Sequence, residues 1–282
     1  MAQHMRDRLG RFGVWRTASQ VTPDLAAALE ELGFGTLWLG SSPSGDLIQA
    51  EELLEATTTL TVATGIVNIW QCDAHDVAAS FARVQASHPD RFLLGVGAGH
   101  REATQQYAKP YETLAGYVDV LLGDGVPAAN LMLAALGPRA LRLAAQRAAG
   151  AHPYLVTPAY TRHARAILGA GPLLAPEHKV VLDADQERAR AIGRKRVQTP
   201  YLGLVNYTSN LRRLGWSDED LSGGGSDALI DALVAHGSPG QVAAQLTEHL
   251  DAGADHVCLQ LLAAAGADPR DGYRQLAQAL AL

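Results

Sequence analysis

The sequence predicts an α/β fold, a (β/α)8 barrel of the TIM type, formed by one domain that spans residues 1–282. Short apolar runs of β type alternate with amphipathic helical runs along almost the whole chain. Eight such apolar runs occur, which is the number of strands in this barrel. The first turn lacks the glycine fingerprint of a dinucleotide-binding sheet, and a length of 282 residues suits a single barrel.

Each predicted strand is apolar at nearly every position, as is typical of parallel strands that are buried on both faces. The predicted strands span residues 10–15, 36–40, 60–66, 91–96, 130–135, 149–156, 178–182 and 256–261. Several helices between them share a start signal, a proline at the first helical position after a capping residue. This signal occurs at Thr22-Pro23, Gly137-Pro138 and Ser238-Pro239, and the three helices end at Gly33, Gly150 and Gly253.

Residues 200–236 do not fit this alternation. They follow the seventh helix and favour two or three short helices around the glycines at 223–225. Insertions in barrels usually lie on the loop face, where they shape the access of a substrate. We therefore expect a helical insertion between strands 7 and 8.

Composition and charge argue against several classes of function. A net charge of −6 argues against a nucleic-acid partner and against an anionic membrane surface. The basic residues at 188–196 are expected to form the solvated face of a helix. No run reaches the roughly 18 apolar residues of a membrane span, and no signal peptide is evident, which favours a cytoplasmic protein. Cys72 and Cys258 match no metal spacing, so neither a metal site nor a disulfide is expected.

Two neighbouring predicted strands end in glycines and polar residues. The third ends in Gly65, Ile66, Val67 and Asn68, and the fourth is followed by Ala98, Gly99 and His100. Ligands of α/β folds bind at the carboxyl ends of parallel strands. Glycines there either allow a flat ligand to approach or form an ordinary strand end and turn. A histidine at the mouth of the barrel can carry a proton near neutral pH, which makes His100 a catalytic candidate.

The fifth strand leads into a helix start that can bind an anion. The segment comprises Ala135, Leu136, Gly137, Pro138 and Arg139. Free backbone N–H groups and the helix dipole favour a phosphate there, and Arg139 can add a charge-assisted contact. An ordinary helix start with Arg139 in water explains the pattern equally well.

Aromatic residues and one histidine lie near other predicted strand ends. Trp15 ends the first strand and Trp70 follows the third, where their rings either wall a pocket or plug the barrel. His152 and Tyr154 lie in the sixth strand. A buried histidine in a strand is more often a satisfied core group than a catalyst.

Along 10–262 the chain resembles the bacterial luciferase-like oxidoreductases, in particular their branch that uses the deazaflavin coenzyme F420. The resemblance rests on the order and spacing of FGVW, ELGFGTLWLG, LTVATGIVNIW, PDRFLLGVGAGH, MLAALGPRALRLAAQRAAGAHPYLVTP, NYTSNLRRLG and GADHVCLQLL. It implies a barrel with a late helical insertion, which binds coenzyme F420 or, alternatively, FMN. It also implies a homodimer.

The resemblance further implies roles for individual residues. A non-prolyl cis peptide at Gly65–Ile66 would back the ring, next to Val67. Asn68 and the turn Ala98-Gly99-His100 would line the ring, with Tyr154 as a further contact, and 135–139 would hold the phosphate. Asn68 and His100 are then the catalytic candidates. The substrate pocket would comprise Trp15, Ser41, Ser42 and Trp70. Sugar-phosphate dehydrogenases of this superfamily carry an Asp-His pair where this chain has Ser41-Ser42.

The resemblance thus implies an oxidoreductase that transfers a hydride between coenzyme F420 and an organic substrate. One alternative is an FMN-dependent monooxygenase on the same barrel, and another is a cofactor-binding barrel without catalysis, which the serines at 41–42 favour. A barrel lyase or isomerase would need a lysine or paired carboxylates at strand ends, and the sequence pattern indicates neither.

Overall fold

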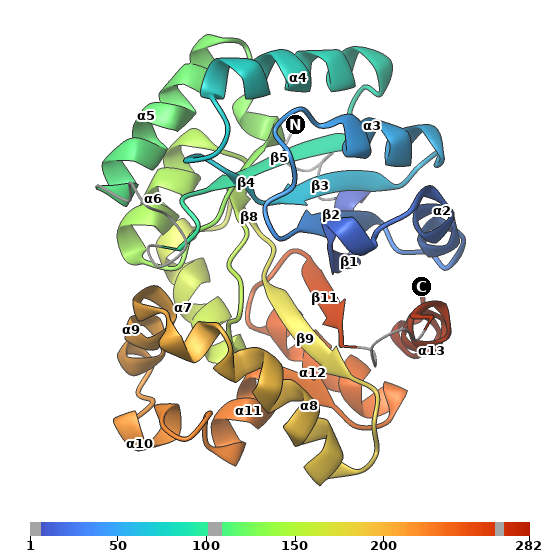
Figure 1. The fold of residues 1–282 in the computed structure, drawn as a ribbon, viewed down its shortest axis with the longest axis vertical. Helices are drawn as coiled ribbons and strands as arrows, with labels where there is room; N and C mark the ends of the chain where they lie inside the picture. Colours follow the sequence, from blue (N-terminus) through green and yellow to red (C-terminus); the bar gives the residue numbers. More distant parts are fainter. Residues whose placement is uncertain (1–6, 101–108, 263–267) are drawn as a thin grey trace.

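Parallel strands form the centre of the protein, and helices surround them (Figure 1). The computed structural model describes residues 7–100, 109–262 and 268–282. The strands of this part are β1 (Phe12–Thr17), β2 (Thr36–Gly40), β3 (Thr61–Gly65), β4 (Val67–Asn68), β5 (Phe92–Gly97), β6 (Leu131–Leu133), β7 (Gly150–Ala151), β8 (Leu173–Leu174), β9 (Glu177–Val181), β10 (Val234–His236) and β11 (Val257–Leu261). All the strand pairs among them are parallel.

The strands close into a ring, which confirms the predicted barrel. From β1 the pairing runs through β2, β3 with β4, β5, β6 and β7 to β8. Strands β8 and β9 follow each other within one segment, 173–181. Because β8 pairs with β7 and β9 pairs with β11, this segment joins the two sides of the sheet. Strand β11 pairs with β1 and completes the ring. Hydrogen bonds of 2.9 Å from Glu177 N to the Pro153 carbonyl and from Cys258 N to the Pro176 carbonyl span this junction.

Several predicted strands were wrong in extent: the fifth, 130–135, is shortened to Leu131–Leu133, and the seventh, 178–182, missed β8. The sixth was expected over 149–156, but β7 covers only Gly150–Ala151. Pro153 has no N–H to donate to a ladder, and Leu155 has a φ of 54°, so the chain leaves the sheet here. The third predicted strand, 60–66, ends at Gly65 as β3, and a separate short strand, β4, follows beyond the predicted range; both pair with β5.

The helices of the described chain lie on the outside of the ring. They are α2 (Pro23–Glu31), α3 (Ile48–Glu55), α4 (Ala74–Ser87), α5 (Pro110–Gly123), α6 (Pro138–Arg147), α7 (Pro158–Leu168), α8 (Gln186–Gln198), α9 (Val205–Arg213), α10 (Asp218–Leu221), α11 (Asp227–Leu233), α12 (Pro239–Asp251) and α13 (Arg270–Leu280). The three predicted helix starts are confirmed, since helices begin at Pro23, Pro138 and Pro239. Thr22 Oγ1 accepts from Leu25 N at 3.3 Å, and Ser238 forms a capping box with Gln241. None of these helices is long and apolar enough to cross a membrane.

The core has an inner and an outer part. Trp38, Ala63, Leu93, Met132 and Cys258 come from different strands and share one buried cluster, which fills the inside of the ring. A larger cluster packs the outward-facing strand residues, such as Leu94 and Leu259, against the helices. The strands are apolar at nearly every position because one face packs inside the ring and the other packs against the helices.

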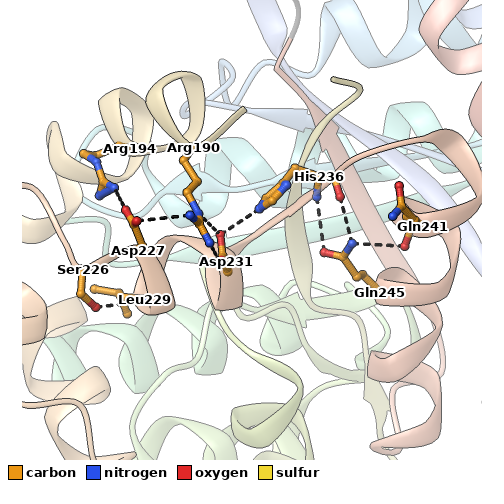
Figure 2. A network of polar contacts seen from close by, with 9 residues as sticks. All are labelled: Arg190, Arg194, Ser226, Asp227, Leu229, Asp231, His236, Gln241 and Gln245. Carbon is orange, nitrogen blue, oxygen red and sulfur yellow. Dashed lines mark hydrogen bonds and ion pairs between the residues drawn. The ribbon is translucent and has the colours of Figure 1, made fainter. Parts of the chain in front are cut away.

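The segment that was expected to be a helical insertion contains a short 3-10 helix (Tyr201–Gly203), α9, α10 and α11. It ends in strand β10, which the sequence analysis missed and which pairs with β9 outside the ring. Part of the basic cluster on α8 holds this segment (Figure 2). Arg190 Nε bonds to Asp231 at 2.8 Å, and Arg194 pairs with Asp227, both on α11. The basic face is therefore partly neutralised by acidic residues.

Candidate active site

A pocket of about 440 Å³ opens at the carboxyl ends of the strands. Strands β1 to β7 and the loops that follow them supply its floor, while α5, the 3-10 helix at 201–203 and α9 supply its walls. Its lining residues are Trp15, Ser41, Ser42, Gly65, Ile66, Asn68, Gln71, Ala98, Gly99, His100, Pro110, Tyr111, Leu114, Ala134, Ala135, Leu136, Gly137, Arg139, Ala140, His152, Tyr154, Tyr201, Asn206 and Tyr207. This is the face where barrel enzymes place their chemistry.

The floor is built from small residues around a cis peptide bond. The bond joins Gly65 and Ile66 and is not prolyl. Asn68 is 5% exposed, and its Oδ1 accepts from Trp70 N at 3.0 Å. Gly99 has a φ of 58°, and a Cβ there would lie 2.9 Å from Asn68 Nδ2. A side chain at Gly99 would therefore displace the asparagine, so this turn needs glycine.

The start of α6 forms one end of the pocket. Gly137 is the N-cap and Pro138 the first helical residue. The hydroxyl of Tyr160 donates to the carbonyls of Ala135 and Leu136, at 2.9 and 3.0 Å, and so fixes the approach to the helix. Backbone N–H groups at the first turn of a helix attract an anion.

Arg139 stands beside this helix start and is already engaged. Its guanidinium lies 4.0 Å from the ring centre of Tyr111 and bonds to Glu112 at 3.2 Å. Among the lining residues that the structure describes, Arg139 is the one arginine or lysine. The anion end of the pocket therefore offers one shared positive charge and a set of backbone donors.

Three tyrosines form the opposite wall. Tyr201 donates to the Tyr154 hydroxyl at 2.9 Å, and Tyr154 donates to Gln260 Oε1 at 2.9 Å. Burial raises the pKa of Tyr201 to about 12 and that of Tyr154 well above its usual value, so both stay protonated donors at neutral pH. His100 lies against this wall, with its ring centre 5.5 Å from that of Tyr207.

Residues 9–123 match the family of luciferase-like monooxygenases. The matched segment covers less than half of the 282 residues, so the match shows that this part of the chain is similar to that family. Among curated proteins, none matches the sequence. Solved structures that cover nearly the whole chain have a similar fold, and their low sequence identity shows the fold alone.

One of these structures is an F420-dependent secondary alcohol dehydrogenase with an F420–acetone adduct. Its TM-score is 0.74 at 15% identity, over 96% of this chain and 98% of that one. The F420-dependent tetrahydromethanopterin reductase of Methanopyrus kandleri has a TM-score of 0.70 at 15% identity, over 96% and 98% of the two chains. The oxygenating part of 3,6-diketocamphane monooxygenase from Pseudomonas putida, in complex with FMN, has a TM-score of 0.62 at 14% identity, over 96% of both chains. Structures of similar fold thus include two F420-dependent enzymes and one in complex with FMN.

Most residues that the sequence singled out meet in this pocket, and three do not line it. Val67 is fully buried below the floor. Trp70 was expected in the substrate pocket, but its Nε1 donates to the Ala98 carbonyl at 2.7 Å and steadies the turn from behind. Pro138 starts α6 without lining the pocket. Ser41 and Ser42 line the rim, and both have a positive φ, of 62° and 55°.

The sequence analysis missed a buried ion pair in strand β9. Lys179 and Glu177 are both 0% exposed, and Lys179 Nζ lies 3.1 Å from Glu177 Oε1. Nζ also lies 4.0 Å from the ring centre of Tyr154, so the pair supports the tyrosine wall. Lys179 lies in the middle of β9 and does not line the pocket. The sequence did carry a signal for this pair: residues two apart in a strand point to the same face, so Glu177 and Lys179 are placed side by side in β9. No cluster of His, Cys, Asp or Glu in the described ranges suits a metal ion.

Proposed function

We propose that this luciferase-like protein is an oxidoreductase that transfers a hydride between coenzyme F420 and an organic substrate. One observation carries the proposal: a single pocket joins a floor of small residues at Gly65–Ile66 to the start of α6. A flat tricyclic ring fits a floor that presents glycine and backbone, and a phosphate fits the helix start. When bound, the deazaflavin ring supplies the carbon centre that accepts or releases a hydride.

The charge at the anion end suits the phosphodiester of coenzyme F420 better than the phosphate monoester of FMN. The phosphodiester in the tail of coenzyme F420 carries one negative charge, whereas a phosphate monoester such as that of FMN carries about 1.5 to 2. The described lining offers one guanidinium, and Glu112 shares it. A monoanion is better matched to this supply than a dianion.

The protein's own residues then have distinct tasks. The Asn68 side chain and the turn at 98–100 hold the edge of the ring, while Ile66 and Leu114 help to exclude water. His100 lies in the pocket near the tyrosine wall, where an imidazole can hold or release the proton that accompanies the hydride. If His100→Ala kept full turnover with an identified substrate, this role would be wrong.

The test is a fluorescence titration of the purified protein with coenzyme F420 and, separately, with FMN. We expect the deazaflavin to bind at micromolar concentration or tighter and FMN to bind more weakly. A preference for FMN would instead support a monooxygenase on the same barrel. Binding of neither cofactor would overturn the proposal.

A matched pair of variants locates the phosphate. Arg139→Ala should weaken binding of the deazaflavin about threefold to tenfold, because one charge-assisted contact at an exposed site is lost. Arg142→Ala removes the same side chain from an exposed position of α6 that does not line the pocket, so it should leave the affinity unchanged. Equal effects of the two substitutions would refute the assignment of Arg139.

A further inference from the structure

Two buried nitrogens on the pocket floor bond to none of the described residues: Nε1 of Trp15 and Nε2 of His152. The two residues are only 4% and 2% exposed, and both line the pocket. A Cβ added to Gly65 would lie 2.9 Å from Trp15 Nε1 and 3.1 Å from His152 Nε2. Both nitrogens therefore face one small region beside Gly65.

The hydrogen bond on the other side of the His152 ring fixes what its Nε2 can do. Nδ1 lies 2.7 Å from the Ala175 carbonyl, which only accepts, so Nδ1 carries the proton. Stacking on Trp38, with ring centres 4.2 Å apart, holds the plane of the ring. Burial lowers the pKa of His152 to about 4, so the ring is neutral at pH 7. Nε2 is then an acceptor, while the indole N–H of Trp15 is only a donor.

In a second indole–imidazole pair of the barrel, the two rings are hydrogen-bonded directly to each other. Trp38 Nε1 donates to His256 Nε2 at 3.1 Å, and His256 Nδ1 bonds to the Gly10 carbonyl at 2.8 Å. In that pair the donor and the acceptor satisfy each other. In the pocket the corresponding atoms of Trp15 and His152 do not, although buried polar groups are nearly always paired. A group placed between them satisfies both.

We infer that Trp15 and His152 together bind a neutral ligand group that carries a hydrogen-bond donor and an acceptor side by side. A hydroxyl meets this requirement, and so do the N–H and C=O of a ring amide. Given the proposed function, on which these two sources rest, the group is either a hydroxyl of the organic substrate or the amide edge of the deazaflavin ring. A carboxylate or a phosphodiester is disfavoured here, because it has no proton to donate to Nε2. The pocket thus has a neutral end at Trp15 and His152 and an anion end at α6.

The experiment is NMR of the full chain with ¹⁵N-labelled histidine and tryptophan. Without a ligand, His152 should show the Nδ1–H tautomer at pH 7. Coenzyme F420 and cyclohexanol are then added separately and together, with methylcyclohexane and cyclohexanecarboxylate as controls. At least one of the first two probes should shift the Trp15 indole N–H and His152 Nε2 together. The Trp38 indole should not shift, since it already bonds to His256.

Two variants test the pair itself. Trp15→Phe removes only the donor and should weaken the active probe about threefold to tenfold. His152→Phe keeps a flat ring against Trp38, removes the acceptor and should weaken the same probe similarly. Should either variant fail to fold, the wild-type spectra still decide the question.

The possible results separate the inference from the proposed function. A joint shift with coenzyme F420 alone assigns the ring amide, and one with cyclohexanol assigns a substrate hydroxyl. If the deazaflavin binds by fluorescence but no probe shifts both nitrogens, the inference is overturned and the proposed function stands. An Nε2–H tautomer, or a joint shift with cyclohexanecarboxylate, also overturns it. If neither F420 nor FMN binds, the proposed function fails, while the cyclohexanol arm still tests the pair.

Discussion

Replacing Lys179 by methionine should destabilise the protein by about 3–5 kcal/mol, the usual cost of removing one partner from a buried ion pair. Lys179 Nζ lies 3.1 and 3.4 Å from the two carboxylate oxygens of Glu177, and neither side chain reaches solvent. Methionine has a similar length, so the packing changes little. What remains is a buried carboxylate that accepts a hydrogen bond from the backbone N–H of Leu155, at 3.0 Å.

The second part of the prediction concerns the pair as a unit. Glu177→Gln in the Lys179→Met background leaves no buried charge, and the amide oxygen can still accept from Leu155 N. The double variant should therefore be more stable than Lys179→Met alone, and the coupling energy should be on the order of 2 kcal/mol. Urea unfolding of the wild type, both single variants and the double variant at pH 7 measures it.

The pH dependence provides an independent check. Burial raises the pKa of Glu177 even with Lys179 present, and removal of the lysine should raise it further. A carboxyl whose folded pKa exceeds its unfolded pKa of about 4.3 stabilises the fold at low pH and loses that contribution as pH rises. Lys179→Met should thus lose less stability at pH 5 than at pH 7. The reasoning would be refuted if each single substitution lowered the free energy of unfolding by less than about 1 kcal/mol and the two effects simply added in the double variant. The two side chains would then not depend on each other for stability.

Three further predictions follow from other parts of the fold. Burial holds the pKa of His152, His178 and His256 at about 4, so the unfolded chain binds more protons between about pH 6.5 and 4. The free energy of unfolding should fall with decreasing pH there, by up to about 1.4 kcal/mol per unit for each histidine, and a flat urea midpoint from pH 7 to 5 would contradict this. Tyr160→Phe should cost about 1 kcal/mol and weaken F420 binding, whereas Tyr117→Phe should do neither, because the Tyr117 hydroxyl bonds to no described residue. Asp231→Asn should cost about 1 kcal/mol in thermal unfolding by weakening the contacts to Arg190 and His236 (Figure 2), and Asp227→Asn, at a 60% exposed site, should cost less.

The sequence predicted the ring of strands because each run is apolar on both faces, and it predicted the candidate pocket because strand ends carry glycine. Local patterns failed where the answer depended on distant residues. Strand β10 is only three residues long and lies beside a helical run, so its pattern carries little signal. The burial of Lys179 depends on Glu177 and on Tyr154 and Tyr201, which come from separate segments. A lysine is almost never fully buried unless it is paired. The i, i+2 spacing puts Glu177 on the same side of the strand, but the tyrosines that cover the pair come from distant parts of the sequence.

His152 shows where a correct general rule gives an incomplete answer. A buried strand histidine is usually a satisfied core group, and Nδ1 of His152 is indeed bonded to the Ala175 carbonyl. The other nitrogen is not satisfied by any described residue, and this depends on where Trp15 and Gly65 lie. Elsewhere in the barrel, Trp38 bonds to His256, His249 bonds to His178, and Lys179 bonds to Glu177. A fold that pairs these buried polar groups with one another leaves Trp15 and His152 open at the pocket, where a ligand can complete them.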